Sequence, residues 1–158
     1  MKTPVQNPMH IERHHPKTLA YIRITGPYGK GYEEPIDRLY QWAGRHGLTG
    51  GECLFIYLDN PETTPGDQCR TDLCLTVPAD AATGGEIEKQ HIPGGTYAVI
   101  RRTVNDPVQY AQYWQELTDD IIAAGIAMDT DRPCYELYHH FDSSSGQADV
   151  SFCIAVAP

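Results

Sequence analysis

Residues 96–104 read TYAVIRRTV, and this segment repeats a pattern that occurs near the start of the chain. The earlier copy, LAYIRIT at residues 19–25, lies 78 positions before it. The matched pairs are Ala20 with Ala98, Ile22 with Ile100, Arg23 with Arg101 and Thr25 with Thr103. A second match, at an offset of 81, links CLFIY at 53–57 with CYELY at 134–138. Matches that keep their order predict an internal repeat. Two unrelated halves of one α+β domain remain the alternative.

Each half of the chain predicts the same order of secondary structure. Alternating or continuous apolar residues between turn signals predict strands at 18–25, 52–60, 70–78, 86–92, 96–104, 134–141 and 148–156. Apolar residues at helical spacing predict helices at 32–47 and 106–125, the second with Asp106 as its N-cap. We therefore expect an α+β fold of tandem β-α-β-β modules with pseudo-two-fold symmetry. Its antiparallel sheets would carry the helices on one face and leave a central groove.

The predicted elements leave a polar N-terminal stretch outside the two modules. Residues 1–17 are interpreted as a tail or edge segment, and residues 18–158 as a single domain. Within this domain, module 1 covers about 18–78 and module 2 about 96–158. A groove where two such modules join is a place where ligand sites tend to occur.

The composition is that of a soluble globular protein with an acidic excess. The 158 residues carry a net charge of −9, and residues 81–158 hold 11 acidic and 4 basic side chains. Since the sequence has no basic stripe for a phosphate backbone, direct nucleic-acid binding is not expected. No apolar run approaches the length of a membrane span, and the start of the chain lacks an apolar signal core. A cytoplasmic protein without a membrane partner is therefore predicted.

The five cysteines are interpreted as reduced thiols, because their number is odd and no Cys-x-x-Cys motif is present. A zinc site at Cys69 and Cys74 is the alternative, but a spacing of five does not match the common zinc motifs. His139 and His140 alternate between the faces of a predicted strand, so a joint metal role is not favoured. Neither a metal nor a cofactor is predicted.

Glu136 is the residue in the second repeat that needs an explanation. At the offset of 81 it takes the place of Phe55, which lies in an apolar strand. A carboxylate in an apolar site is costly unless it is paired or protonated. In one interpretation, Glu136 is exposed to solvent or is bonded to a neighbour such as Arg101 or Arg132. The other makes it the counter-charge of a cationic ligand, or an acid or base, in an aromatic setting.

The chain resembles the GyrI-like small-molecule-binding domains, and in particular the stand-alone DNA gyrase inhibitors of bacteria. The resemblance runs from about residue 18 to the end of the chain. It rests on a set of segments in fixed order: ITGPY (24–28), YLDNPETTP (57–65), RTDLCLTVP (70–78), IPGGTYAVIRRTV (92–104), YWQEL (113–117), RPCYELYHH (132–140) and FCIAVAP (152–158). It implies two β-α-β-β modules packed about a pseudo-two-fold axis, with the ligand site in the groove between them.

The resemblance also implies which residues meet the ligand. A glutamate on the strand that matches CYELY meets cationic, often aromatic drugs in the relatives, and that role carries over to Glu136. Tyr28, Trp114 and Tyr138 are the candidates for the aromatic lining. For Trp114 the alternative is a core position on its helix, and for Tyr28 a solvated loop. The relatives that regulate transcription carry a helix-turn-helix module, for which the segment before residue 18 is too short.

Three functions follow, the first from the residues and the resemblance together and the other two as what the resemblance implies. The first is the binding of small cationic or planar aromatic molecules with Glu136 as the counter-charge. The second is inhibition of DNA gyrase, as a stress response that protects the cell against gyrase-directed toxins. The third is hydrolysis of cyclopropane-bearing alkylating toxins, in which Glu136 would be the catalytic acid or base. No other nucleophile or phosphate-binding motif is present, so an enzyme is the less favoured interpretation.

Overall fold

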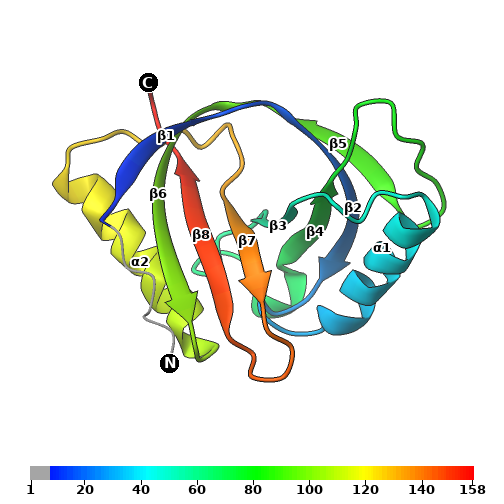
Figure 1. The fold of residues 1–158 in the computed structure, drawn as a ribbon. Coiled ribbons are helices and arrows are strands. Elements are labelled where there is room, and N and C mark those ends of the chain that lie inside the picture. The colour runs from blue at the N-terminus through cyan, green and yellow to red at the C-terminus, as the bar shows by residue number, and fades with distance from the viewer. Residues whose placement is uncertain (1–7) are drawn as a thin grey trace. The chain divides into compact units, whose positions relative to one another are not determined.

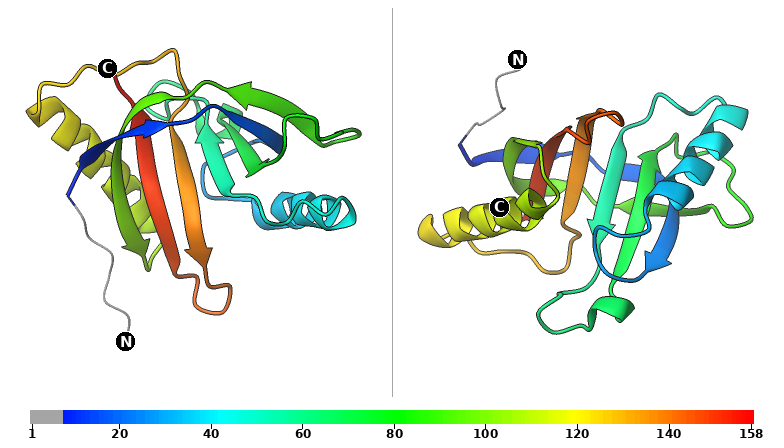
Figure 2. Two further views of the ribbon diagram at one scale, coloured as in Figure 1. Left: turned by 45° about the horizontal axis from the view of Figure 1, so that its top comes forward. Right: turned by 90° about the horizontal axis from the view of Figure 1, so that it is seen from below.

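The computed structural model describes residues 8–158, which adopt the α+β architecture expected from the sequence. The chain divides into two compact units. The first unit is Pro16–Ile92, and the second combines the segment up to His15 with Pro93–Pro158. Each unit consists of a four-stranded antiparallel sheet with one helix on one face (Figures 1 and 2). Of the N-terminal tail predicted at 1–17, residues 1–7 lie outside the described residues.

The first unit follows the predicted order strand, helix, strand, strand. Its elements are β2 (Lys17–Thr25), α1 (Glu33–Arg45), β3 (Cys53–Tyr57), the 3-10 turn η1 (Gly66–Gln68), β4 (Arg70–Thr76) and β5 (Glu88–Ile92). In the sheet, β4 pairs with β3 and β2, and β5 pairs with the other edge of β2. Helix α1 packs on β2 and β4, where Leu39, Trp42 and Ala43 join the core of this unit (Figure 2).

The second unit repeats this arrangement. Its elements are β1 (His10–His14), β6 (Gly95–Val104), α2 (Val108–Ala123), β7 (Tyr135–Phe141) and β8 (Ala148–Ala155). In the sheet, β8 pairs with β6 and β7, and β1 pairs with the other edge of β6. Helix α2 lies along β6 and β8 (Figure 1) and contributes Leu117 and Ile121 to the core. The helix begins at Val108, later than predicted, although the carboxylate of Asp106 accepts the Val108 N–H at 3.0 Å.

The strand registers support the internal repeat. In each unit, the three repeated strands pair side by side, and one residue from each of them lies in a single row across the sheet. The two series are Ile22, Leu73 and Phe55 in the first unit and Ile100, Phe152 and Glu136 in the second. Glu136 therefore occupies the same structural position as Phe55, as the sequence offset predicted. A phenyl ring is compatible with this position of the fold, so the fold itself does not require a carboxylate there.

No helix among residues 8–158 is both long enough and apolar enough to cross a membrane. All five cysteines carry free thiols. Three of them, Cys69, Cys74 and Cys153, are buried and behave as small core residues.

Candidate ligand-binding site

Glu136 lies near the start of β7 and is 1% exposed. Because successive strand residues point to opposite faces of a sheet, its neighbours Cys134 and Tyr138 share its face. Both of these neighbours pack against the core on the α2 side of the sheet. Tyr135 points to the opposite face, where its hydroxyl bonds to His14 and its ring lies 5.2 Å from that of Tyr97. The carboxylate is therefore enclosed between the sheet and α2.

Both oxygens of the Glu136 carboxylate accept a hydrogen bond from an aromatic side chain. The indole Nε1–H of Trp114 donates to Oε2 at 2.8 Å. The hydroxyl of Tyr138 donates to Oε1 at 2.9 Å. Both donors are neutral groups, so these two bonds solvate the carboxylate without neutralising it. The structure thus brings together three of the four residues that the sequence singled out.

Tyr110 completes the aromatic surroundings of Glu136. It precedes Trp114 by one helical turn on α2 and, like Tyr138, packs against the core of this unit. Burial raises the pKa of Tyr110, and the nearby negative charge of Glu136 raises it further. The Trp114 ring meets Phe152 edge to face, with the ring centroids 5.3 Å apart. We call Glu136, Trp114, Tyr138 and Tyr110 the Glu136 cluster.

Tyr110 is not among the site residues predicted from the sequence. The signal that identifies it is its spacing of four residues before Trp114, which brings both side chains onto one face of the helix. Of the two arginines considered as partners for Glu136, Arg101 forms a bidentate pair with Asp149 at 2.6 and 2.9 Å. Arg132 bonds the carboxylate of Asp129 at 2.9 Å.

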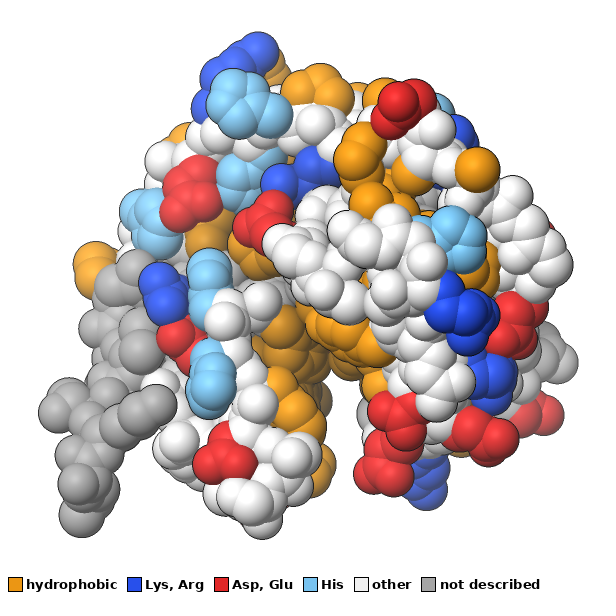
Figure 3. Space-filling view, turned by 45° about the vertical axis from the view of Figure 1, so that its right-hand side comes forward, with side chains coloured by type: hydrophobic (Ala, Val, Ile, Leu, Met, Phe, Trp, Pro, Cys, Tyr) orange, Lys and Arg blue, Asp and Glu red, His pale blue; other side chains and the backbone are white. Residues whose placement is uncertain are grey.

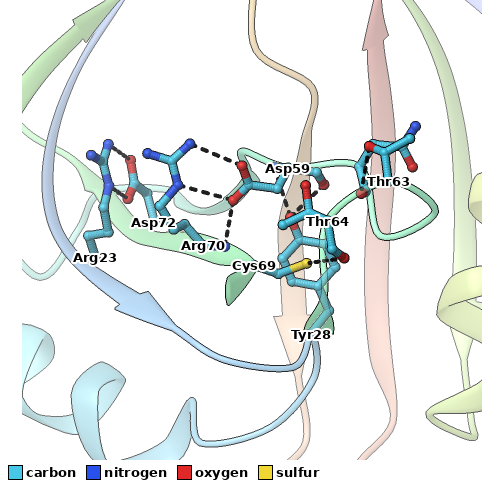
Figure 4. Close-up of polar contacts among 9 residues, drawn as sticks. Arg23, Tyr28, Asp59, Thr63, Thr64, Cys69, Arg70 and Asp72 are labelled. Atoms are coloured by element: carbon cyan, nitrogen blue, oxygen red, sulfur yellow. Dashed lines mark hydrogen bonds and ion pairs between the residues drawn. The ribbon is translucent and has the colours of Figure 1, made fainter. Parts of the chain in front are cut away.

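Tyr28, the fourth predicted site residue, lies in the first unit (Figure 4). Its hydroxyl donates to the Asp59 carbonyl oxygen at 2.6 Å and accepts the Asp59 N–H at 2.9 Å. Burial raises its pKa to about 12. The carboxylate of Asp59 in turn holds the guanidinium of Arg70. The two hydrogen bonds of Tyr28 thus fix the backbone of the loop between β3 and β4. That Tyr28 lies in a groove with Glu136 stays a prediction.

Charged side chains of both signs are interspersed on the face drawn in Figure 3, where Lys and Arg do not form a continuous stripe. Several of the arginines are held by carboxylates, including the bidentate pair of Arg23 with the buried Asp72. Such pairing reduces the positive potential that each arginine presents to a partner.

Comparison with known proteins identifies the family. Residues 7–103 match the model of the GyrI-like small-molecule-binding domain, which is more than half of the chain. The chain belongs to this family. A DNA gyrase inhibitor of Yersinia enterocolitica is 32% identical to it over 139 residues, covering 85% of this GyrI-like chain and 88% of the relative. The DNA gyrase inhibitor of Escherichia coli K12 is 26% identical over 152 residues, covering 94% and 96%.

Solved structures with low sequence identity share the fold of this GyrI-like protein. EcmrR in its complex with DNA matches with a TM-score of 0.79 at 15% identity, covering 94% of this chain and 57% of EcmrR. SAV2435 bound to tetraphenylphosphonium matches with a TM-score of 0.61 at 14% identity, covering 96% and 94%. A hydrolase from Listeria innocua matches with a TM-score of 0.71 at 11% identity, covering 97% and 93%. At these identities the likeness shows the fold alone.

Proposed function

We propose that this GyrI-like protein binds small cationic aromatic molecules at the Glu136 cluster, with Glu136 as the counter-charge. The observation that carries this proposal is the buried carboxylate at a position where the repeat holds Phe55. Burying a carboxylate is unfavourable by several kcal/mol before its partners compensate. Because a phenyl ring occupies the equivalent position in the first unit, the fold does not need a charge there. Ligand binding therefore explains the buried carboxylate better than a role in folding does.

The surroundings of Glu136 suit a cation that carries aromatic groups. Trp114 and Tyr138, which donate to the carboxylate, and their neighbour Tyr110 are each partly exposed. Aromatic rings attract cations through their electron-rich faces, and Trp and Tyr do so more strongly than Phe. The negative charge below the rings adds to that attraction. The fold neighbour with bound tetraphenylphosphonium supports this ligand class, because that compound is a cation with four phenyl groups.

Addition of tetraphenylphosphonium is therefore expected to raise the melting temperature of the protein. A ligand present at about 100 times its Kd and bound only to the native state adds about 2.7 kcal/mol to the unfolding free energy. For a chain of this size the shift is roughly 5–10 °C. The measurement is a thermal-shift titration, with triphenylphosphine oxide as the neutral control. Equal shifts with both compounds would show that the positive charge is not recognised.

We further propose that the protein inhibits DNA gyrase. The support is the similarity to proteins named DNA gyrase inhibitor, which covers nearly the full length of both chains. The net charge of −9 suits a partner surface that is basic because it handles DNA.

The purified protein is expected to slow supercoiling of relaxed plasmid by gyrase in a dose-dependent manner. Raising the salt concentration should weaken this effect, because charge attraction between exposed groups is screened. The Glu136→Gln variant, assayed in parallel, shows whether the Glu136 cluster contributes to the inhibition of gyrase. Supercoiling that proceeds unchanged at a large molar excess of the protein would refute the inhibitor proposal and leave the ligand proposal intact.

Hydrolysis of cyclopropane-bearing alkylating toxins is the alternative function. Glu136 would then act as the acid or base, and a water molecule would have to reach one of its oxygens beside the Trp114 or Tyr138 donor. Mass spectrometry of such a compound after incubation with the protein distinguishes hydrolysis from binding alone. A binding protein returns the compound unchanged. A product heavier by one water, absent with Glu136→Gln, would make the protein a hydrolase.

A further inference from the structure

Two arginines on neighbouring strands of the first unit each bind a carboxylate through two parallel N–H groups. Arg23 on β2 donates from Nε and Nη2 to the two oxygens of Asp72, at 2.7 and 3.0 Å. Arg70 on β4 donates from the same two nitrogens to the two oxygens of Asp59, both at 3.0 Å. Figure 4 shows the four side chains in a row, in the order Arg23, Asp72, Arg70 and Asp59. We call these four residues the arginine row.

Each guanidinium of the arginine row keeps an unused edge. A guanidinium carries five N–H donors, and its carboxylate partner takes only the Nε–H and one Nη2–H. The other Nη2–H and one Nη1–H form a second pair of parallel donors. No acceptor among residues 8–158 bonds to this second pair in either arginine. The side chains of Arg23 and Arg70 are 42% and 47% exposed, so an anion in solution can reach both edges.

The carboxylates fix the direction in which the two guanidiniums point. Asp72 is fully buried and also accepts the side-chain amide of Gln90 at 2.9 Å. Asp59 also accepts the backbone N–H of Arg70 at 2.8 Å, so it holds this arginine at both ends. An arginine that is already held in place loses less conformational entropy when it binds a ligand.

The internal repeat shows that the fold does not need these side chains. The strand registers make Ser151 the counterpart of Asp72, and Asp149 the counterpart of Arg70. The second unit therefore has a serine in place of the buried carboxylate and an acid in place of the second arginine. A buried carboxylate is costly unless it is paired. Its presence in the first unit alone is explained if Asp72 positions an arginine for binding.

The two arginines are close enough to repel each other. The hydrogen bonds to Asp59 raise the pKa of Arg70, and the positive charge of Arg23 acts in the opposite direction. An anion in contact with both guanidiniums would offset this repulsion. The two carboxylates lie behind the guanidiniums, at about twice the distance from such an anion, so they cancel only about half of the attraction.

We propose that Arg23 and Arg70 together bind a phosphomonoester through their unused edges. A phosphomonoester is a dianion with three terminal oxygens, which can accept parallel N–H groups from two guanidiniums. A phosphodiester has one charge and two terminal oxygens, enough for one guanidinium. Because the carboxylates balance the charge of the arginines, this site selects by bond geometry and offers little to a long phosphate backbone. It lies in the first unit and is separate from the function proposed for the Glu136 cluster.

The test follows the arginine Nε–H signals by NMR while methyl phosphate is added to ¹⁵N-labelled protein at pH 7.5 and constant ionic strength. Methyl phosphate is mostly a dianion at this pH, because the second pKa of a phosphomonoester is about 6. The signals of Arg23 and Arg70 should shift together and saturate with a Kd on the order of 1 mM, since half of the attraction is cancelled. Dimethyl phosphate, the phosphodiester counterpart, should bind at least about tenfold more weakly because it loses charge-assisted hydrogen bonds.

Arg70→Lys separates the bond geometry from the charge. Lysine keeps the positive charge but has no pair of parallel donors, so methyl phosphate should bind about tenfold more weakly. Arg38→Lys is the matched control, expected to stay within about twofold, because the Arg38 side chain is 40% exposed and also bonds a carboxylate, that of Glu86 at 2.8 Å.

Three results would each overturn the proposal. The first is equal binding of the two phosphates by the wild type. The second is the absence of a saturable shift at Arg23 and Arg70, and the third is unchanged affinity in Arg70→Lys. If that variant is not folded by circular dichroism, the comparison of the two phosphates in the wild type decides.

Discussion

Replacing Glu136 by Gln is expected to weaken the binding of tetraphenylphosphonium by about 10- to 100-fold. The substitution removes the negative charge and keeps nearly the same shape. Two opposite unit charges about 6 Å apart attract each other by about 3 kcal/mol at the effective dielectric constant of about 20 that describes protein sites. Each 1.4 kcal/mol corresponds to about a tenfold change in Kd. Isothermal titration of both proteins measures this ratio.

Glu116→Gln is the control for this substitution. Glu116 lies on α2, is 40% exposed at its side chain and pairs with Arg102, so the variant removes one negative charge from the same helix region without touching the Glu136 cluster. Its effect on affinity is expected to stay within about twofold, since solvent and salt screen exposed charges. Similar losses in both variants would mean that the net charge, and not Glu136, attracts the ligand.

Gly51→Ala is expected to lower the free energy of unfolding by about 2–3 kcal/mol, the range seen when atoms are forced into a packed site. A Cβ atom at Gly51 would lie 2.1 Å from the carbonyl oxygen of Thr76. This oxygen belongs to the backbone and has little freedom to move. The same Thr76 bonds to Glu52 through its hydroxyl at 2.7 Å and its N–H at 2.9 Å, so any shift would disturb the start of β3.

The neighbouring glycine provides a control for this prediction. A Cβ atom at Gly50 would meet no heavy atom within 4 Å. Gly50→Ala is therefore expected to change the stability by less than about 1 kcal/mol, with a small gain possible because alanine restricts the unfolded chain. Urea unfolding of both variants separates the two positions. Equal stability losses would show that the close approach at Gly51 is not the cause.

The order of the elements was predictable from the sequence because each strand and helix has a local signal. Apolar alternation between turns predicted β2 and β6, and helical spacing predicted α1 and α2. The repeat offsets went further, because they assigned Glu136 and Phe55 to equivalent positions of the two modules before any strand pairing was known. The strand β1 was not distinguishable from a tail, since its pairing with β6 joins residues far apart in the sequence.

The candidate site was only partly predictable. Strand alternation placed Glu136 and Tyr138 on one face, and helical spacing placed Trp114 on an inward stripe. Neither pattern predicts that the indole N–H and the phenol hydroxyl converge on the two carboxylate oxygens, because that depends on how α2 packs on the sheet. Tyr110 was missed for the same reason: Glu136, whose negative charge raises the pKa of Tyr110, lies on another element.

The central claim is that Glu136 is the counter-charge of the bound cation, and a crystal structure of the protein with tetraphenylphosphonium tests it most directly. The account predicts phosphonium density against the rings of Trp114, Tyr138 and Tyr110. The phosphorus atom should lie within about 8 Å of the Glu136 carboxylate, a distance over which charges interact before salt screens them. Density found only at a site remote from Glu136, with the cluster unchanged, would contradict the account.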